Sequence, residues 1–371
     1  MDRDSAERRT AALSPNEAYR LVSPLFSKEW PRTDVRNVHT KRLIGGLINT
    51  LHLVWRDTPA LDEPASVLVR HFGLDSDPKE PPEDSISLST AQQAIVYWEL
   101  GGRGWGPKVY GLLPGGRVEE YIDSHTLTAA EAIQPDVARD VARSYARLHS
   151  LRLPLRRDGY QRVTQDFITR ARDRRDEVMQ TLLALEDPIA AEYATLFGEI
   201  DWTEELRWVS ALFEKHHCKT TITHGDTNHL NVLVKNFESD CRVVLIDYET
   251  VSYSYRGFDI GGHFNERQYC YNQPHTQLTG YPAPNANEQR RFCEAYLEEM
   301  RTLGQKMSEC DTVEHLMLEA QIGRLYSILF TNLMCMVYDD VEDDPLFLSA
   351  LIHTVKDYGE LKKGFLDMAT D

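Results

Sequence analysis

Cysteine is scarce in this sequence, with six residues in a chain of 371. No two of them form a Cys-x-x-Cys pair, and neither Cys nor Glu stands at zinc-ligand spacing around His224 and His229. These absences argue against a disulfide scaffold and against a zinc site. We therefore expect reduced thiols and a cytoplasmic protein.

Long apolar runs are also missing. No stretch approaches the ~18 apolar residues that a membrane-spanning helix needs. The N-terminal segment MDRDSAERRT is polar and charged, and it lacks the apolar core of a signal peptide. We expect neither a membrane span nor secretion.

Positive charge is in deficit, because 41 Lys and Arg face 58 Asp and Glu, giving a formal net charge of −17. Such a field repels nucleic acid and anionic membrane surfaces, and it attracts small cations. The plainer alternative is that acidity only keeps the protein in solution. The acidic run DDVEDD (339–344) allows the same two interpretations, a solvated loop or a means of concentrating a cationic substrate.

Hydrophobic patterning divides the chain into a β-rich first part and a helical second part. Ser14, Pro15 and Glu17 are typical of a helix start, and this helix should end or kink near Pro24. The expected strands lie within 42–55, 66–73 and 106–122, with a helix from Thr90 between them, and the expected helices lie at 128–153, 164–217, 286–305 and 312–371. The length favours two domains. We predict an α+β fold with an N-lobe of 1–123 and a mainly helical C-lobe of 124–371.

One hairpin interrupts the helical part, and it carries the strongest chemical signal. The segment ITHGDTNHLNVLV (222–234) places Asp226 five residues before Asn231, and the strand RVVLID ends in Asp247. A hairpin of this length can bring Asn231 and Asp247 together, with Asp226 on the loop just before them. The alternative is a buried hairpin with two capping carboxylates, which does not explain why the Asp and the Asn stand on converging ends.

These three residues are the groups that phosphoryl transfer requires. One carboxylate, Asp226, can orient the attacking hydroxyl and accept its proton. An amide and a carboxylate, Asn231 and Asp247, can supply oxygen ligands to Mg²⁺ that bridges ATP phosphates. The His-x-Asp-x₄-Asn spacing is weak alone, and the hairpin and the preceding β-rich lobe strengthen it.

The N-lobe offers complementary groups for a nucleotide. Gly45 and Gly46 form a candidate phosphate-covering turn, where backbone N–H groups can approach the ligand. Arg70 ends the third strand, where a kinase keeps its phosphate-pairing cation. Each feature has a plainer interpretation, an ordinary hairpin turn and a surface charge.

The segment VVLIDYETVSYSYRGFDIGGHFNE (243–266) resembles the signature of the choline/ethanolamine kinase family. GPKVYG (106–111), GGL (45–47), VLVR (67–70) and THGD (223–226) resemble the family at their own positions, so the likeness extends over about residues 15–335. The resemblance implies a bilobal protein-kinase-like fold and an ATP-dependent kinase. It would make phosphocholine or phosphoethanolamine, the first step towards phosphatidylcholine or phosphatidylethanolamine.

The resemblance also implies roles for individual residues. Asp226 would be the catalytic base, Asn231 and Asp247 would bind Mg²⁺, and Glu249 would support the metal or the loop. Arg256 and Asp259 would hold the C-lobe together rather than contact substrate. Candidate ATP-binding residues are Gly45, Gly46, Leu47, Asn49, Arg70, Glu120 and Ile122. A homodimer is implied by the family and by no particular residue.

The amino-alcohol pocket departs from the family pattern. A quaternary ammonium is recognised by aromatic faces and carboxylates, and Asp226, Glu266, Tyr271 and Tyr326 are the candidate substrate contacts. Thr250 stands where choline kinases have Tyr, and Gly323 and Tyr326 stand where they have Trp. Asn265 and Tyr248 are similar to ethanolamine kinases, whereas Arg256-Gly257 is similar to choline kinases. The sequence does not rank the two substrates.

Two further departures concern the loop and the N-lobe. Gly225 replaces an Asn that is frequent in the family, although related antibiotic kinases carry His-Gly-Asp. Gln93 occupies the helix position expected to hold a Glu that pairs with Arg70, with Glu99 as the alternative. Two other functions therefore stay open. One is a kinase for another small cationic or aminoglycoside-like alcohol, and the other is a weakly active pseudokinase that binds nucleotide or a partner protein.

Overall fold

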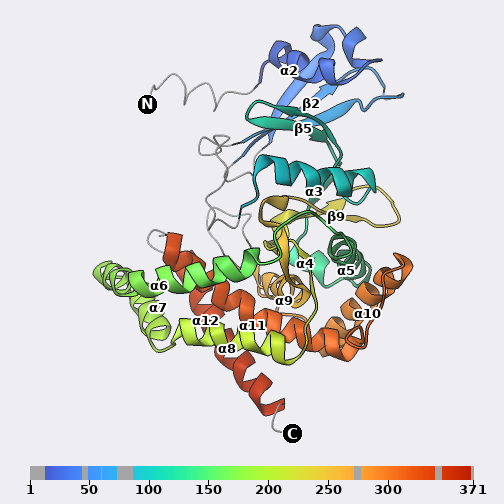
Figure 1. The fold of residues 1–371 in the computed structure, drawn as a ribbon. Coiled ribbons are helices and arrows are strands. Elements are labelled where there is room, and N and C mark those ends of the chain that lie inside the picture. Colours follow the sequence, from blue (N-terminus) through green and yellow to red (C-terminus); the bar gives the residue numbers. More distant parts are fainter. Residues whose placement is uncertain are drawn as a thin grey trace. The chain divides into compact units, whose positions relative to one another are not determined.

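The computed structural model describes residues 13–43, 49–59, 61–72, 87–270, 277–338 and 345–368. The chain forms two compact units, one of residues 1–81 and 89–123, the other of 82–88 and 124–371. The first unit is drawn from blue to cyan in Figure 1, and most of the second from green to red. The roles predicted for the two lobes stay predictions.

The first unit is built on a five-stranded antiparallel sheet with the strand order β1-β2-β3-β5-β4. Helix α2 packs on one part of it, and buried Trp30, Val54, Val67, Val69 and Val118 form its core. The elements are α2 (Pro15–Val22), β1 (Val38–Leu43), β2 (Thr50–Arg56), β3 (Ser66–His71), α3 (Thr90–Gly102), β4 (Val109–Leu113) and β5 (Gly116–Glu120).

Helix α2 shows how local chemistry sets an element boundary. The Ser14 hydroxyl accepts the Glu17 amide, the Glu17 carboxylate accepts the Ser14 amide, and Pro15 occupies the first turn. The helix ends at Val22 and passes into a 3₁₀ turn over Ser23–Leu25. The expected helix start and its end near Pro24 are confirmed.

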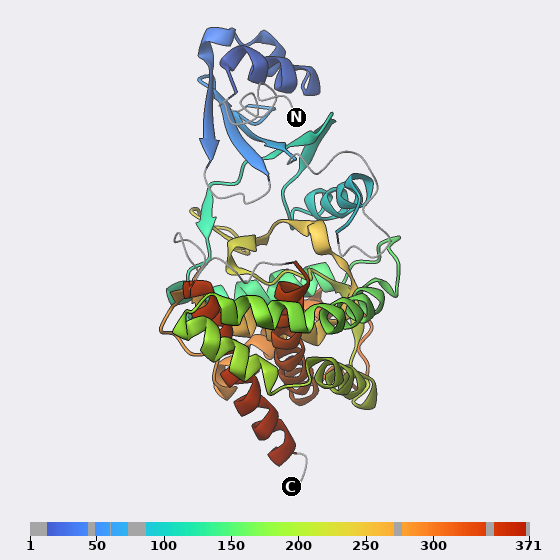
Figure 2. The ribbon, with the colours of Figure 1, turned by 90° about the vertical axis from the view of Figure 1, so that its left-hand side faces the viewer.

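The second unit is mainly helical. Green α6 and α7 and red α12 lie beside one another in both views (Figures 1 and 2), and α11 contacts α6, α8, α9, α10 and α12. The helices are α4 (Ala129–Ala132), α5 (Pro135–His149), α6 (Gly159–Ala184), α7 (Pro188–Gly198), α8 (Trp202–Lys215), α9 (Arg256–Glu266), α10 (Ala286–Thr302), α11 (Val313–Tyr338) and α12 (Pro345–Met368).

The second unit also contains short strands, which pair in three small antiparallel sheets. Strand β6 (Ser124–Thr126) pairs with β8 (Val232–Lys235), which pairs with β9 (Val243–Leu245). Strand β7 (Thr220–Thr223) pairs with β10 (Ser252–Tyr255), and β11 (Tyr269–Cys270) with β12 (Gln277–Leu278). The predicted hairpin is therefore confirmed as β8–β9, and it receives a third strand from β6.

Helix α9 crosses α11 at a very short distance, because glycines lie at the contact, Gly257 and Gly261 on α9 and Gly323 on α11. A Cβ at Gly323 would overlap the carbonyl oxygen of Gly257, and a Cβ at Gly261 would overlap the backbone of α11. The crossing is tied further by Arg256, which is fully buried and contacts Glu319 at 2.6 Å and Asp311 at 2.6 Å. The close approach fixes α9, and through it the loop that α9 supports.

In the part of the chain that the structure describes, no helix combines the length and the apolar character of a membrane crossing.

Candidate active site

The loop after β7 needs glycine at its second position. Gly225 has a φ of +83°, a region that side chains disfavour. An added Cβ would lie 2.5 Å from the Tyr160 hydroxyl and 2.7 Å from the Thr250 carbonyl oxygen. The glycine that looked like a departure from the family pattern is thus required by the packing around the loop.

A buried carboxylate holds this loop by its backbone. Asp259 on α9 accepts the His224 amide at 2.6 Å and the Gly225 amide at 3.0 Å. His149 Nε2 lies 3.0 Å from the same carboxylate, and its Nδ1 lies 2.9 Å from the Tyr296 hydroxyl. If Nε2 donates to Asp259 and Nδ1 accepts from the Tyr296 hydroxyl, all three side chains have a hydrogen-bond partner.

The predicted base emerges from this loop with an exposed carboxylate. Asp226 Oδ2 accepts a hydrogen bond from Asn231 Nδ2 at 2.7 Å, and Oδ1 accepts the Asn228 amide at 3.2 Å. Both bonds fix the carboxylate in position while leaving it open to an incoming hydroxyl. The structure therefore brings Asp226 and Asn231 together, as the spacing predicted.

The hairpin brings Asp247 to the same place. Val232 pairs with Leu245, and the Ile246 amide donates to the Asn231 carbonyl at 2.9 Å. His224 links the loop to this strand end, since its Nε2 lies 2.8 Å from the Ile246 carbonyl oxygen and its Nδ1 accepts the Asp226 amide at 3.4 Å. Loop and hairpin are thus connected immediately beside Asp247.

Asp247 differs from its neighbours in backbone conformation and in the surroundings of its carboxylate. Its backbone is left-handed, with φ 66° and ψ 64°, a conformation unusual for a residue other than glycine. Its Oδ1 is buried and accepts no hydrogen bond from the described residues, and burying such an acceptor is costly. Asn231 stands at the same end of the hairpin, where its main-chain carbonyl accepts the Ile246 amide, and a carboxylate and an amide are oxygen donors that a hard cation such as Mg²⁺ accepts.

Among the described residues, no group of three or more His, Cys, Asp or Glu side chains could hold a metal by itself.

Negative charge surrounds the loop. Burial raises the pKa of Tyr145 well above its usual value, and the charges of Asp259, Asp226 and Glu266 raise it further. The predicted base and the predicted acidic substrate contact, Asp226 and Glu266, therefore act on the same buried phenol. Glu266 is the last residue of α9, the helix whose Asp259 holds the loop.

The predicted contact Tyr326 and the two departures from the family pattern, Thr250 and Gly323, have structural partners. Tyr326 is 6% exposed, belongs to the hydrophobic core and contacts the Thr164 hydroxyl. Thr250 donates its hydroxyl to the His224 carbonyl at 2.9 Å, so it supports the loop. Gly323 lies at the α9–α11 crossing rather than at a pocket wall. Tyr271 lies outside the described residues.

The first unit contains a buried ion cluster that the sequence did not predict. Arg70 on β3 contacts Glu119 on β5 at 3.1 Å, and Arg117 contacts the same carboxylate at 2.5 Å. Burial opposes ionisation of Glu119, but the charges of Arg70 and Arg117 lower its pKa. A signal for Glu119 was present, since strand alternation points residues 117 and 119 to one face.

The helix α3 partners differ from those expected. Gln93 Oε1 accepts from Arg117 Nη1 at 3.3 Å. Glu99, the alternative partner for Arg70, instead pairs with Arg103 at 2.9 Å on the surface of its own helix. That alternative was wrong, and the carboxylate beside Arg70 comes from the sheet.

The remaining nucleotide candidates are placed as follows. Glu120 pairs with Lys108 through backbone and side chain, at 2.8 and 3.2 Å. Asn49 and Ile122 are half-buried. Gly45, Gly46 and Leu47 lie outside the described residues.

Comparison with known proteins identifies similar chains. A family model described as choline/ethanolamine kinase matches residues 40–343. A human choline/ethanolamine kinase is 27% identical over 352 residues, covering 90% of this chain and 82% of that protein. A probable ethanolamine kinase of Arabidopsis thaliana is 26% identical and covers 92% and 83%.

A solved choline kinase from Cryptosporidium parvum has a TM-score of 0.69 at 18% identity and covers 96% of both chains. An ethanolamine kinase from Plasmodium vivax has a TM-score of 0.56 at 18% identity, covering 87% of this chain and 82% of that one. These likenesses bear on the fold, and the predicted α+β protein-kinase-like class is confirmed.

Proposed function

Because the chain belongs to the choline/ethanolamine kinase family, we propose that it transfers the γ-phosphoryl group of ATP to the hydroxyl of choline or ethanolamine, through Asp226, Asn231 and Asp247. The resemblance seen in the sequence and the assignment as a kinase are confirmed by the family match. The products are phosphocholine or phosphoethanolamine, the entry to phosphatidylcholine or phosphatidylethanolamine synthesis.

One observation carries the site assignment. Asp247, whose Oδ1 is buried and accepts no hydrogen bond from the described residues, follows strand β9 at the end of the hairpin where Asn231 precedes β8, beside the exposed carboxylate of Asp226. A buried acceptor without a partner lowers the stability of the folded protein. A purely structural role of the hairpin therefore does not explain this oxygen.

In this proposal Asp226 receives the hydroxyl of the amino alcohol. Its carboxylate orients that oxygen towards the phosphorus atom and accepts its proton as the new P–O bond forms. The Asn231 amide N–H and the Asn228 backbone N–H keep the carboxylate in position. Asn231 and Asp247 would hold Mg²⁺, which supplies positive charge to the phosphates when it is bound.

The first unit would bind the nucleotide. Arg70 is oriented by Glu119, so its guanidinium is fixed before a phosphate arrives. Gly45, Gly46, Leu47, Asn49, Glu120 and Ile122 are the further candidates for ATP contacts. Glu266 would receive the ammonium group of the substrate, and Tyr271 and Tyr326 stay candidate aromatic contacts, with Tyr326 the weaker because it lies in the core.

The experiment that tests the function is a substrate panel. Purified protein with Mg²⁺ and ATP is mixed with choline, ethanolamine, monomethylethanolamine and an aminoglycoside, and ADP release and phosphorylated product are measured. We expect turnover with choline or ethanolamine, with the ratio of their kcat/KM values deciding the preference. Turnover only with the aminoglycoside would establish the alternative substrate class, and ATP binding without turnover would indicate a pseudokinase.

We also propose a cytoplasmic location and a homodimer. The location is supported by six free cysteines, four of them buried, since such thiols persist in a reducing compartment. The homodimer follows only from the family.

A further inference from the structure

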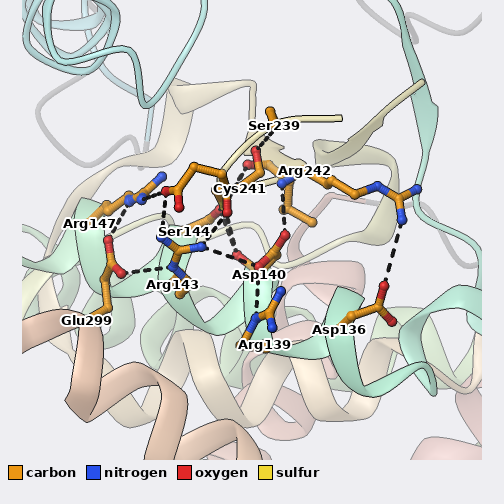
Figure 3. A network of polar contacts seen from close by, with 12 residues as sticks. Asp136, Arg139, Asp140, Arg143, Ser144, Arg147, Ser239, Cys241, Arg242 and Glu299 are labelled. Carbon is orange, nitrogen blue, oxygen red and sulfur yellow. Dashed lines mark hydrogen bonds and ion pairs between the residues drawn. The ribbon is translucent and has the colours of Figure 1, made fainter. Parts of the chain in front are cut away.

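Three arginines recur at four-residue intervals along α5 and form one stripe on the helix, Arg139, Arg143 and Arg147. Figure 3 shows them beside the turn that joins β8 to β9. Two of the three, Arg143 and Arg147, reach that turn, whereas the Nε of Arg139 contacts Asp140 of its own helix at 3.2 Å.

Arg143 binds the turn through both main chain and side chain. Its Nη1 donates to the Asp240 carbonyl oxygen at 2.5 Å, and its Nη2 donates to Asp240 Oδ2 at 2.6 Å. Arg147 Nη2 adds a third contact to Asp240, the second to its carboxylate, at 3.4 Å. A planar guanidinium with two such bonds fixes the orientation of its partner as well as its distance.

A third element holds the arginines themselves. Glu299 on α10 accepts Arg143 Nε at 2.9 Å and Arg147 Nε at 2.6 Å, and its side chain is 7% exposed. Glu299 therefore holds both guanidinium groups from the side of α10, as the dashed contacts in Figure 3 show.

Helix α5 makes two further hydrogen bonds to the chain that enters strand β9. Asp140 Oδ2 accepts the Arg242 amide at 2.8 Å, and the Ser144 hydroxyl donates to the Val243 carbonyl at 3.1 Å. Residues 240–243 are thus bound to α5 at consecutive positions, so the turn end of the hairpin has little freedom.

This turn is one end of the hairpin whose other end carries Asn231 and Asp247. Strands β8 and β9 pair at three positions, Val232 with Leu245, Leu233 with Val244 and Val234 with Val243. One further backbone bond joins them at each end, from the Lys235 amide to the Arg242 carbonyl and from the Ile246 amide to the Asn231 carbonyl. In so short a ladder, a displacement at the turn reaches the far end with few intervening hydrogen bonds to absorb it.

We propose that Arg143 and Arg147, fixed by Glu299, act as positioning residues that set the separation of the two metal-binding side chains, Asn231 and Asp247. This clamp touches neither nucleotide nor substrate and acts through the β8–β9 hairpin. The inference rests on the proposed function, because it takes Asn231 and Asp247 as the metal ligands.

The test separates metal binding from nucleotide binding. Dissociation constants of ADP are measured by calorimetry on the full chain, once without divalent metal and once with Mn²⁺. Their ratio reports how well the protein's own ligands accept the metal. A residue with a merely structural role would weaken both measurements and leave the ratio unchanged.

We expect Arg143→Ala to reduce this ratio by about tenfold, as loss of supporting contacts around metal ligands does, while ADP alone binds as in the unsubstituted protein. Arg143→Lys keeps the charge without the two-pronged geometry and should recover part of the loss. Arg139→Ala is the matched control on the same helix and should leave the ratio unchanged.

If Arg143→Ala does not fold, Asp240→Ala decides the matter, because Asp240 is exposed and its loss removes the carboxylate contacts of both Arg143 and Arg147, leaving only the bond from Arg143 to the main-chain carbonyl oxygen. An unchanged ratio in the folded Arg143 variant, or in Asp240→Ala, overturns the proposal. If Mn²⁺ does not tighten ADP binding even in the unsubstituted protein, the metal assignment itself is wrong and the clamp falls with it. Failure of the amino-alcohol panel with a normal Mn²⁺ ratio leaves the clamp intact and rejects only the substrate.

Discussion

At the scale of single residues, Gly225 is a position where both the surrounding packing and the backbone conformation disfavour a side chain. Replacing it with Ala would place a Cβ against Tyr160 and Thr250 in a left-handed backbone. We expect Gly225→Ala to lower kcat by about 100-fold, because Asp226 is the next residue and small displacements of a catalytic group have effects of this size. Steady-state kinetics measures this.

Gly304→Ala is the matched control for that variant. Gly304 also has a positive φ, of 68°, but an added Cβ would meet nothing within 4 Å. It should lose stability by about 1 kcal/mol or less and keep its kcat. Equal loss of kcat in both variants would contradict the steric account of the loop.

Gly323 shows where reasoning from sequence fails. Its position suggested a lost aromatic wall of the substrate pocket, but its Cα packs against the backbone of Gly257. Such a close helix crossing depends on a partner 66 positions away in the sequence, which no local pattern reveals. Asp226, Asn231 and Asp247 could be predicted because the hairpin that joins them is local.

We therefore expect Gly323→Ala to lower the free energy of unfolding by about 2 kcal/mol or more, since overpacking of a buried contact has this cost. Gly359→Ala on α12 is the control, because an added Cβ there meets nothing within 4 Å, and it should be neutral or slightly stabilising. Urea unfolding measures both. A neutral Gly323→Ala would show that the helices do not meet as closely as described.

At the scale of elements, the β8–β9 hairpin followed the prediction closely, and the segments expected to be mostly helical are helical. The division of 164–217 among the three helices α6, α7 and α8 was not predicted. The boundary signals were present, since Asp187 caps α7 ahead of Pro188 and Asp201 caps α8. These boundaries were missed because the amphipathic pattern continues across them. Each of the three helices packs a similar apolar face against the same core.

Two imidazoles join η4 (His229–Asn231) to α9, and they make the stability dependent on pH. Their rings lie 5.0 Å apart, and burial, followed by His229 and Arg267, lowers the pKa of His263 well below 6.5. The unfolded chain thus binds a proton more readily than the folded protein. The contribution is therefore favourable above pH about 6.5 and is lost as the pH falls below that value.

We expect the free energy of unfolding to fall between pH 7 and pH 5, and His263→Gln to make this fall shallower, by at most about 1.4 kcal/mol for each pH unit below 6.5. His125 is the contrasting control, since hydrogen bonds to Glu131 and Asn236 raise its pKa, so His125→Gln should make the fall steeper. Urea titrations at three pH values measure both slopes. Parallel slopes in all three proteins would contradict the assignment.

At the scale of the whole molecule, the sequence predicted a β-rich part, a helical part and the chemistry of the second. The structure places Asp226, Asn231 and Asp247 in one unit, while Arg70 and the other nucleotide candidates belong to the other. The cluster of Arg70, Glu119 and Arg117 was not predicted. It depends on the pairing of β3 with β5, two strands far apart in the sequence, and no local sequence pattern predicts that pairing. The net charge of −17 accords with a cationic substrate.

The measurement that tests the central claim most directly is the rate of phosphocholine or phosphoethanolamine formation by Asp226→Ala in Mg²⁺ and ATP. We expect kcat to fall at least about 100-fold, as loss of a general base does, with ADP binding retained. Asp158→Ala, at an exposed carboxylate outside the site, should match the unsubstituted protein. Turnover by Asp226→Ala at the unsubstituted rate would contradict the account.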